Sequence, residues 1–200
     1  MKRLAMMLSG LAVALLASTG DVRAQGIALT PTIGGYVPAS DFYELRDEAD
    51  RLRVERDPAL ALGLNAELGW LRGSLVYATG ARLTGDGLAS EGQIGEGSLL
   101  AASADLVLRP VPRLIIVQPY LLGGIGVKNT SYDFDEDGAG AAFPDGRTDT
   151  ALHIGVGADL MLGGIGLVAE VSDYISKDGS GDFRAHDAFA MVGLKFRLGL

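Results

Sequence analysis

The chain has 200 residues, of which 48% are hydrophobic and 29 are glycine, and it contains no cysteine. The length predicts one domain, and the lack of cysteine excludes a disulfide framework and thiol chemistry. A formal net charge of −8 argues against nucleic-acid binding, because a protein that binds phosphates needs a basic surface. The sequence also has no glycine-rich phosphate loop that precedes a helix.

The start of the chain has the layout of a cleaved secretory signal. A basic start is followed by an apolar run over residues 4–17, and the small residues Val22 and Ala24 mark a cleavage site. The run is too short for a membrane helix, and its apolar residues lack the one-sided period of a buried amphipathic helix. We therefore predict a signal peptide over residues 1–24 and an exported domain over residues 25–200.

The exported domain alternates apolar residues with small or polar ones, which is the period of a β-strand. In "LALGLNAELGW" (60–70) the even positions are apolar, and the odd positions are Gly, Ala, Asn and Glu. The prolines Pro31 and Pro119 are expected at a bulge or a strand end. Clear alternation recurs at 74–83, 99–109, 151–162 and 188–200, and weaker patterns at 27–37, 114–127 and 165–175 complete a set of eight predicted strands.

The gaps between these strands alternate in length. The short gaps lie at 69–73, 109–113 and 163–164, and the long ones at about 41–57, 84–97, 128–148 and 176–185. An even number of antiparallel strands, with short turns at one end and long loops at the other, is typical of outer-membrane barrels. We predict an all-β fold, an eight-stranded antiparallel transmembrane β-barrel with short periplasmic turns and long extracellular loops.

The two faces of each strand then meet different surroundings. In a membrane barrel the leucine face contacts lipid, with Trp70 and Tyr77 near the headgroups, and the small polar face lines the interior. The alternative is a soluble exported barrel that holds its leucines inside and binds a small apolar ligand. That barrel needs an outer face dense in charge, whereas the faces opposite the leucines are mostly Gly, Ala and Ser.

Charged residues occur on the predicted interior face at comparable heights. Because an isolated charge there would be costly, we predict a lumen cluster in which basic and acidic side chains pair. An eight-stranded barrel is filled by its own side chains, so little room is left for a channel. The predicted basic members are Lys195 and Arg197, and the acidic members are Glu67, Asp105, Asp159 and Glu170.

The first long gap, at 41–57, is rich in charge. The spacing of Asp47 and Arg51 allows a short helix with a charged face. A solvated loop without such a helix is the simpler interpretation.

The third long gap contains a possible calcium loop. Asp133, Asp135 and Asp137 have the spacing of the first carboxylates in a calcium-binding loop. Pro144 stands where that loop needs a bidentate glutamate, so a complete EF-hand is excluded. We expect no other cofactor, and a merely solvated loop is the alternative to calcium binding.

An enzyme that modifies lipids would need a nucleophile next to a base, usually Ser with His. The chain has two histidines, His153 and His186, and neither lies in an apparent Ser and His motif. We therefore predict that the protein is not an enzyme, and a lipid-modifying barrel enzyme stays as the alternative.

The chain resembles the small outer-membrane β-barrel proteins of Gram-negative bacteria, the superfamily of the OmpA transmembrane domain and its single-domain relatives. The resemblance is carried by the signal, the eight alternating stretches, "QPYLLGGIG" and "MVGLKFRLGL". It implies a monomer in the outer membrane with a structural or surface-interaction role, in contact with outer-membrane lipid and lipopolysaccharide. It also implies insertion by the barrel-assembly machinery, which reads a terminal aromatic residue in relatives. Here the last residue is Leu200, and the nearest aromatic residue of the same parity is Phe196.

Overall fold

The structure is a computed structural model. It describes residues 26–38, 43–47, 50–86, 92–110, 117–134, 146–177 and 183–198, so the predicted signal peptide lies outside the described residues. The described residues form ten strands: β1 (Ile27–Pro38), β2 (Tyr43–Asp47), β3 (Asp50–Arg56), β4 (Ala59–Leu68), β5 (Leu71–Asp86), β6 (Gly92–Leu108), β7 (Val117–Phe134), β8 (Gly146–Leu162), β9 (Ile165–Lys177) and β10 (Phe183–Leu198). They include no helix with the length and apolar character needed to cross a membrane.

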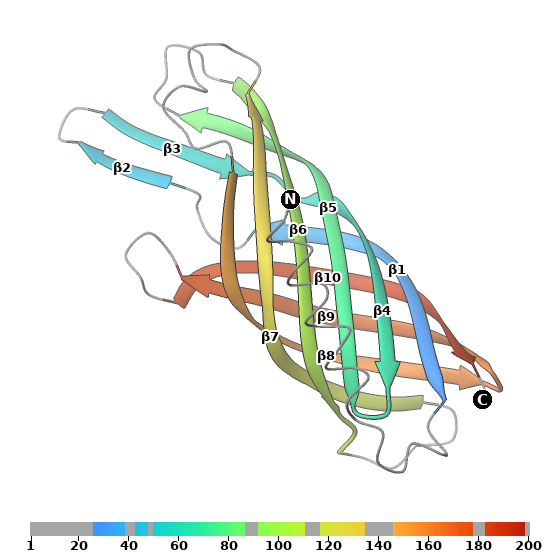
Figure 1. The fold of residues 1–200 in the computed structure, drawn as a ribbon. Helices are drawn as coiled ribbons and strands as arrows, with labels where there is room; N and C mark the ends of the chain where they lie inside the picture. Colours follow the sequence, from blue (N-terminus) through green and yellow to red (C-terminus); the bar gives the residue numbers. More distant parts are fainter. Residues whose placement is uncertain are drawn as a thin grey trace, which may run out of the picture.

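Eight of these strands close into a single antiparallel barrel (Figure 1). The pairing runs in the order β5, β4, β1, β10, β9, β8, β7, β6, and β6 pairs back with β5. This last ladder closes the wall, so each barrel strand has a hydrogen-bonded neighbour on both sides. The predicted eight-stranded antiparallel barrel is confirmed.

The gap at 41–57, predicted as a loop, contains a β-hairpin. Strands β2 and β3 form an antiparallel ladder that ends at Asp47 and Asp50, and β3 then pairs with the far end of β5. The short helix that the spacing of Asp47 and Arg51 would allow is absent, since these residues lie on opposite strands of the hairpin. The physical reason is the length of β5, which continues past β4 and offers an edge to β3. In Figure 1 the hairpin projects from the end of the barrel opposite the β4–β5 turn.

The strands also extend into the other gaps that were predicted as long loops. β5 continues to Asp86 and β6 begins at Gly92, while β7 continues to Phe134 and β8 begins at Gly146. The barrel wall is taller at this end than the alternation of apolar and polar residues in the sequence indicates. The reason is that hydrogen bonds to the neighbouring strands keep the backbone extended beyond the last alternating residues.

The opposite end has tight turns, as predicted. Two-residue turns at 69–70 and 163–164 connect β4 to β5 and β8 to β9. Gly69 and Gly163 have φ values of 64° and 69°, which glycine adopts without steric cost.

The two prolines lie inside strands. Pro119 is near the start of β7, opposite Ala158, as expected for proline in a sheet. Pro31 lies in the middle of β1 opposite Leu64, and the ladder to β10 skips Pro31 without a change of register. The bulge expected at Pro31 is therefore absent. Pro31 has no N–H to donate toward β10, but it keeps its place in the ladder with β4, so the register does not change.

The apolar side chains of the wall face outward. Leu64 and Val156, both in mid-strand, are 48% and 57% exposed, and Trp70 and Tyr77 lie on the same outer surface. Alternate residues such as Glu67 are buried inside the barrel. This arrangement is the reverse of a soluble barrel with an apolar interior, so the soluble alternative is wrong.

The outward faces give a direct test of contact with lipid. We expect Leu64→Arg and Val156→Arg each to lower the free energy of unfolding from a bilayer by about 2–4 kcal/mol, because a guanidinium at mid-membrane loses its hydration. Thr148→Arg, on the exposed upper end of β8, is the control and should cost at most about 1 kcal/mol. Equilibrium urea unfolding in lipid vesicles measures the free energy of unfolding of all three variants. Equal losses at the three positions would contradict the placement of Leu64 and Val156 on the lipid-facing surface.

Candidate functional site in the barrel lumen

An ionic cluster fills the lumen near the end where the two-residue turns lie. Its three acids and three bases carry formal charges that cancel, 3 − 3 = 0. We call it the turn-end cluster, and its members are Glu67, Arg72, Arg109, Asp159, Glu170 and Lys195.

Lys195 of β10 lies between acids from two other strands. Its Nζ donates to both carboxylate oxygens of Glu67 at 3.2 Å and to Asp159 Oδ2 at 2.9 Å. Arg109 Nη2 reaches the same two acids, at 2.5 Å from Glu67 Oε1 and 3.4 Å from Asp159 Oδ2. Lys195 is 1% exposed, so its charge depends on these partners.

Arg72 links Glu67 to the other acid of the turn-end cluster. Its guanidinium donates to Glu67 Oε2 at 3.2 Å and also to Glu170 Oε2. Tyr120 donates to Glu170 Oε2 at 2.7 Å, and the Arg72 guanidinium lies 4.8 Å from the Tyr120 ring centroid. Gly157 makes room for this ring, since a Cβ there would lie 2.4 Å from Tyr120 Cζ.

A second polar group lies in the middle of the lumen around Asp105. Its Oδ2 accepts hydrogen bonds from Ser74 and Ser103, each at 2.9 Å, and its Oδ1 lies 2.8 Å from His153 Nδ1. Ser103 Oγ is also 3.0 Å from His153 Nδ1. The His153 ring stacks on Tyr174 with centroids 4.1 Å apart.

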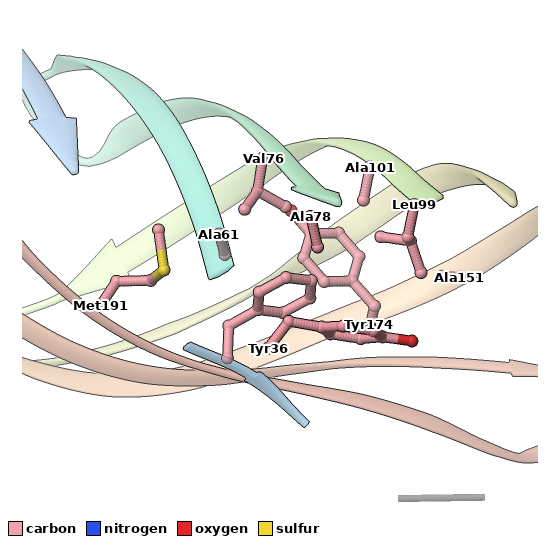
Figure 2. Packing of buried hydrophobic residues seen from close by; sticks show 10 residues of the cluster. Tyr36, Ala61, Val76, Ala78, Leu99, Ala101, Ala151, Tyr174 and Met191 are labelled. Atoms are coloured by element: carbon pink, nitrogen blue, oxygen red, sulfur yellow. The ribbon is translucent and has the colours of Figure 1, made fainter. Parts of the chain in front are cut away.

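An aromatic layer covers this group toward the taller end. Figure 2 shows Tyr36, Tyr174 and Met191 among the apolar side chains that meet inside the barrel. Phe189 packs between the two tyrosine rings, with centroids 5.1 Å from Tyr36 and 5.8 Å from Tyr174. Above it, Tyr36 donates to Asp187 at 2.6 Å, and Asp187 also pairs with Lys128.

Side chains fill most of the lumen between the strands that the structure describes. A cavity of about 20 Å³ lies below the aromatic layer, beside His153, Glu170 and Asn65. This volume holds about one water molecule. The cavity is therefore too small for an organic ligand.

The residues predicted for the lumen have three different positions. The structure brings Glu67, Asp159, Glu170 and Lys195 together in the turn-end cluster. Asp105 belongs instead to the separate group around His153. The remaining member, Arg197, is exposed, and no ion pair of its side chain is present among the described residues.

The predicted calcium site lies mostly outside the described residues. Asp133 is exposed near the end of β7, while Asp135 and Asp137 are not described. Within the described parts of the chain, no three His, Asp or Glu side chains are grouped so that they could hold a metal ion.

Several residues of the site were not among the predicted members of the lumen cluster. They are Arg72, Arg109, Tyr120, Lys128, His153 and Asp187. Most of them lie at the alternate strand positions that face the lumen. If the alternation is continued to the ends of the strands, it therefore predicts that their side chains point inward. Their partners, however, depend on which strands face each other across the lumen.

Neither a protein-family model nor a curated protein sequence matches this chain. Solved outer-membrane proteins share its fold at low sequence identity. The outer membrane protein OprG from Pseudomonas aeruginosa has a TM-score of 0.61 and 17% identity, over 89% of this chain and 98% of that chain. Neisserial surface protein A has a TM-score of 0.53 and 11% identity, over 86% and 97% of the two chains.

A major outer membrane protein from Thermus thermophilus is also similar, with a TM-score of 0.52 and 16% identity over 88% of this chain and 100% of that chain. All three likenesses extend over nearly the full length of both chains. The fold is therefore that of the small outer-membrane β-barrels, and the resemblance seen in the sequence is confirmed at the level of fold.

Two basic residues of β10 allow a matched test of the turn-end cluster. We expect Lys195→Met to lower the free energy of unfolding by about 3–5 kcal/mol, because it removes a buried cation from Glu67 and Asp159. Arg197→Met removes an exposed charge two residues away and should change stability by less than about 0.5 kcal/mol. Urea unfolding in lipid measures both, and similar losses would show that Lys195 is not held by its acids.

Proposed function

We propose that this chain, which has the fold of a small outer-membrane barrel, lies in the outer membrane as a monomer with a structural or surface-interaction role. One observation carries the proposal, namely the outward position of the apolar side chains together with the ion pairs inside. The half-exposed leucines, isoleucines and valines of the wall form a surface suited to lipid. Outer-membrane lipid and lipopolysaccharide are the partners of this surface, and the barrel-assembly machinery inserts the chain.

The filled lumen supports a role other than solute passage. The turn-end cluster blocks one end, the aromatic layer lies above it, and the cavity between them has room for about one water molecule. A hydrated ion needs a wider path. Interaction with partners then takes place at the tall end of the wall, where the β2–β3 hairpin projects.

The geometry around His153 supports a role without catalysis. Ser103 Oγ and Asp105 Oδ1 both approach the same ring atom, Nδ1. A catalytic serine needs the opposite arrangement, with the serine at one ring nitrogen and the carboxylate at the other. All three side chains are also buried. Release of fatty acid from lipopolysaccharide by the purified protein, lost on changing either histidine, would contradict this part of the proposal.

The experiment that tests the membrane role is electrophoresis of the membrane-fraction protein with and without boiling, combined with conductance in planar bilayers. We expect the unboiled protein to migrate as a folded barrel, to fractionate with the outer membrane and to form no stable ion-conducting channel. A protein found soluble in the periplasm would contradict the location. A steady conductance from the folded protein would instead contradict the filled lumen.

We also propose calcium binding by Asp133, Asp135 and Asp137, whose spacing matches the start of a calcium loop. Calcium should then release or absorb heat on titration and raise the unfolding temperature of the folded barrel. Asp135→Asn with Asp137→Asn should remove both effects, whereas Asp149→Asn on the neighbouring strand should not. No heat and no gain in unfolding temperature in the unchanged protein would refute the site.

A further inference from the structure

The sheet has an open edge at the β2–β3 hairpin. Each barrel strand has a neighbour on both sides, and β3 pairs with both β2 and β5. β2 stands at the end of the pairing order, so among the described residues it pairs with β3 alone. In Figure 1 this strand projects with the hairpin from the tall end of the barrel. An unpaired strand edge offers N–H and C=O groups with which another strand can form a ladder.

The register of the hairpin gives it an apolar face and a charged face. Residues directly opposite each other in an antiparallel ladder lie on the same face of the sheet. The residues of β2 therefore alternate between two faces, with Leu45 on one and its neighbours Glu44 and Arg46 on the other. The opposed pairs of the apolar face are Tyr43 with Val54 and Leu45 with Leu52, followed by Asp47 with Asp50 at its end, and those of the charged face are Glu44 with Arg53 and Arg46 with Arg51.

One pair on the charged face is unfavourable within the hairpin itself. Arg46 lies directly opposite Arg51, and like charges at directly opposite positions destabilise a ladder. Glu44, by contrast, lies opposite Arg53, whose charge it complements. Arg46 therefore has no acid opposite it in the β2–β3 ladder. A strand that adds to the free edge of β2 is placed to supply that acid.

The sequence of β2 is complementary to itself in one register. Two copies of the strand can pair edge to edge and antiparallel about a two-fold axis perpendicular to the sheet, which keeps each face of the two hairpins continuous. A register centred on Leu45 places Glu44 of each copy opposite Arg46 of the other. Registers centred on Glu44 or on Arg46 place two glutamates or two arginines opposite each other. Because opposite charges stabilise such a pair and like charges destabilise it, the register centred on Leu45 is favoured.

We propose that the free edge of β2 binds β2 of a second copy of this chain, so that the two hairpins form one four-stranded sheet in the order β3–β2–β2–β3. Leu45 then lies opposite Leu45 of the second copy, between two pairs of Glu44 with Arg46. The inference rests on the surface-interaction role proposed above and names the partner of that role. Each barrel wall stays closed within one chain, so the barrel proposed above as a monomer is kept and the two copies meet through their hairpins alone.

The lack of cysteine in the chain allows a disulfide test of this register. Leu45→Cys places two thiols opposite each other at the two-fold axis, with Cα atoms about 4.5–5.5 Å apart, which a disulfide can bridge. Leu52→Cys is the matched control, because it lies on the same face but three strand spacings, about 14 Å, from its copy. We expect mild oxidation of the folded protein in micelles to link Leu45→Cys into a dimer and to leave Leu52→Cys unlinked. Equal yields of dimer from the two variants, or none from Leu45→Cys, would overturn the proposal.

A charge exchange separates pairing between copies from stability of the hairpin. Arg46→Glu replaces the unfavourable pair with Arg51 by a favourable one, but its new carboxylate faces Glu44 of the second copy. We expect it to raise the dissociation constant of the paired copies about tenfold, measured by sedimentation equilibrium in density-matched micelles. Adding Glu44→Arg reverses both members of each pair and should restore the original constant. An unchanged constant in Arg46→Glu, or an unchanged protein that stays single at every concentration, would overturn the proposal.

The change of electrophoretic mobility on boiling shows separately whether the barrel of each variant is folded. A protein that shows this change and fractionates with the outer membrane, but whose copies do not pair, would overturn the present inference and leave the membrane role standing. A protein found soluble in the periplasm would instead overturn the proposed function. If Leu45→Cys does not fold, sedimentation of the unchanged protein and of the charge exchange decides.

Discussion

A β-strand in hydrocarbon has no water to satisfy its N–H and C=O groups, so every strand of a membrane wall needs a hydrogen-bonded neighbour on both edges. The pairing of β5 with β6 meets this requirement, because it joins the two ends of the barrel sheet. Closure then divides the side chains into two sets that cannot exchange. Residues of one parity contact the surroundings, and residues of the other parity share a narrow interior.

The polar interior follows from that division. Buried ion pairs contribute little net stability, yet leaving one partner alone is expensive. Their main effect is on register, since a slip of one residue would turn Glu67 and Lys195 outward and turn the leucines inward. Close contacts reinforce the same choice. Gly157 lies against the Tyr120 ring and Gly124 lies against Asp105, where a larger side chain would not fit.

The sequence predicts the barrel well because its main signal is local. Period-two alternation indicates eight strands and their outward faces, and it needs no knowledge of neighbours. The β2–β3 hairpin was missed because its support is the extended edge of β5, a feature of distant pairing. The same limit applies inside the lumen. Alternation places Glu67 and Lys195 inward, but the stagger between strands decides that Arg72 reaches Glu170 and that Asp105 meets a histidine.

The position of Lys195 along the chain has a consequence for assembly. Glu67 and Asp159 are synthesised before it, and the β1 edge stays open until β10 pairs with it. A barrel lacking its last strand therefore has two unpaired backbone edges, on β1 and β9, and acids without their shared lysine. Docking of β10 in register removes both defects in one step, whereas docking out of register pairs the backbone edge but leaves Lys195 away from Glu67 and Asp159. The same strand, β10, therefore completes the wall and supplies the buried lysine of the interior.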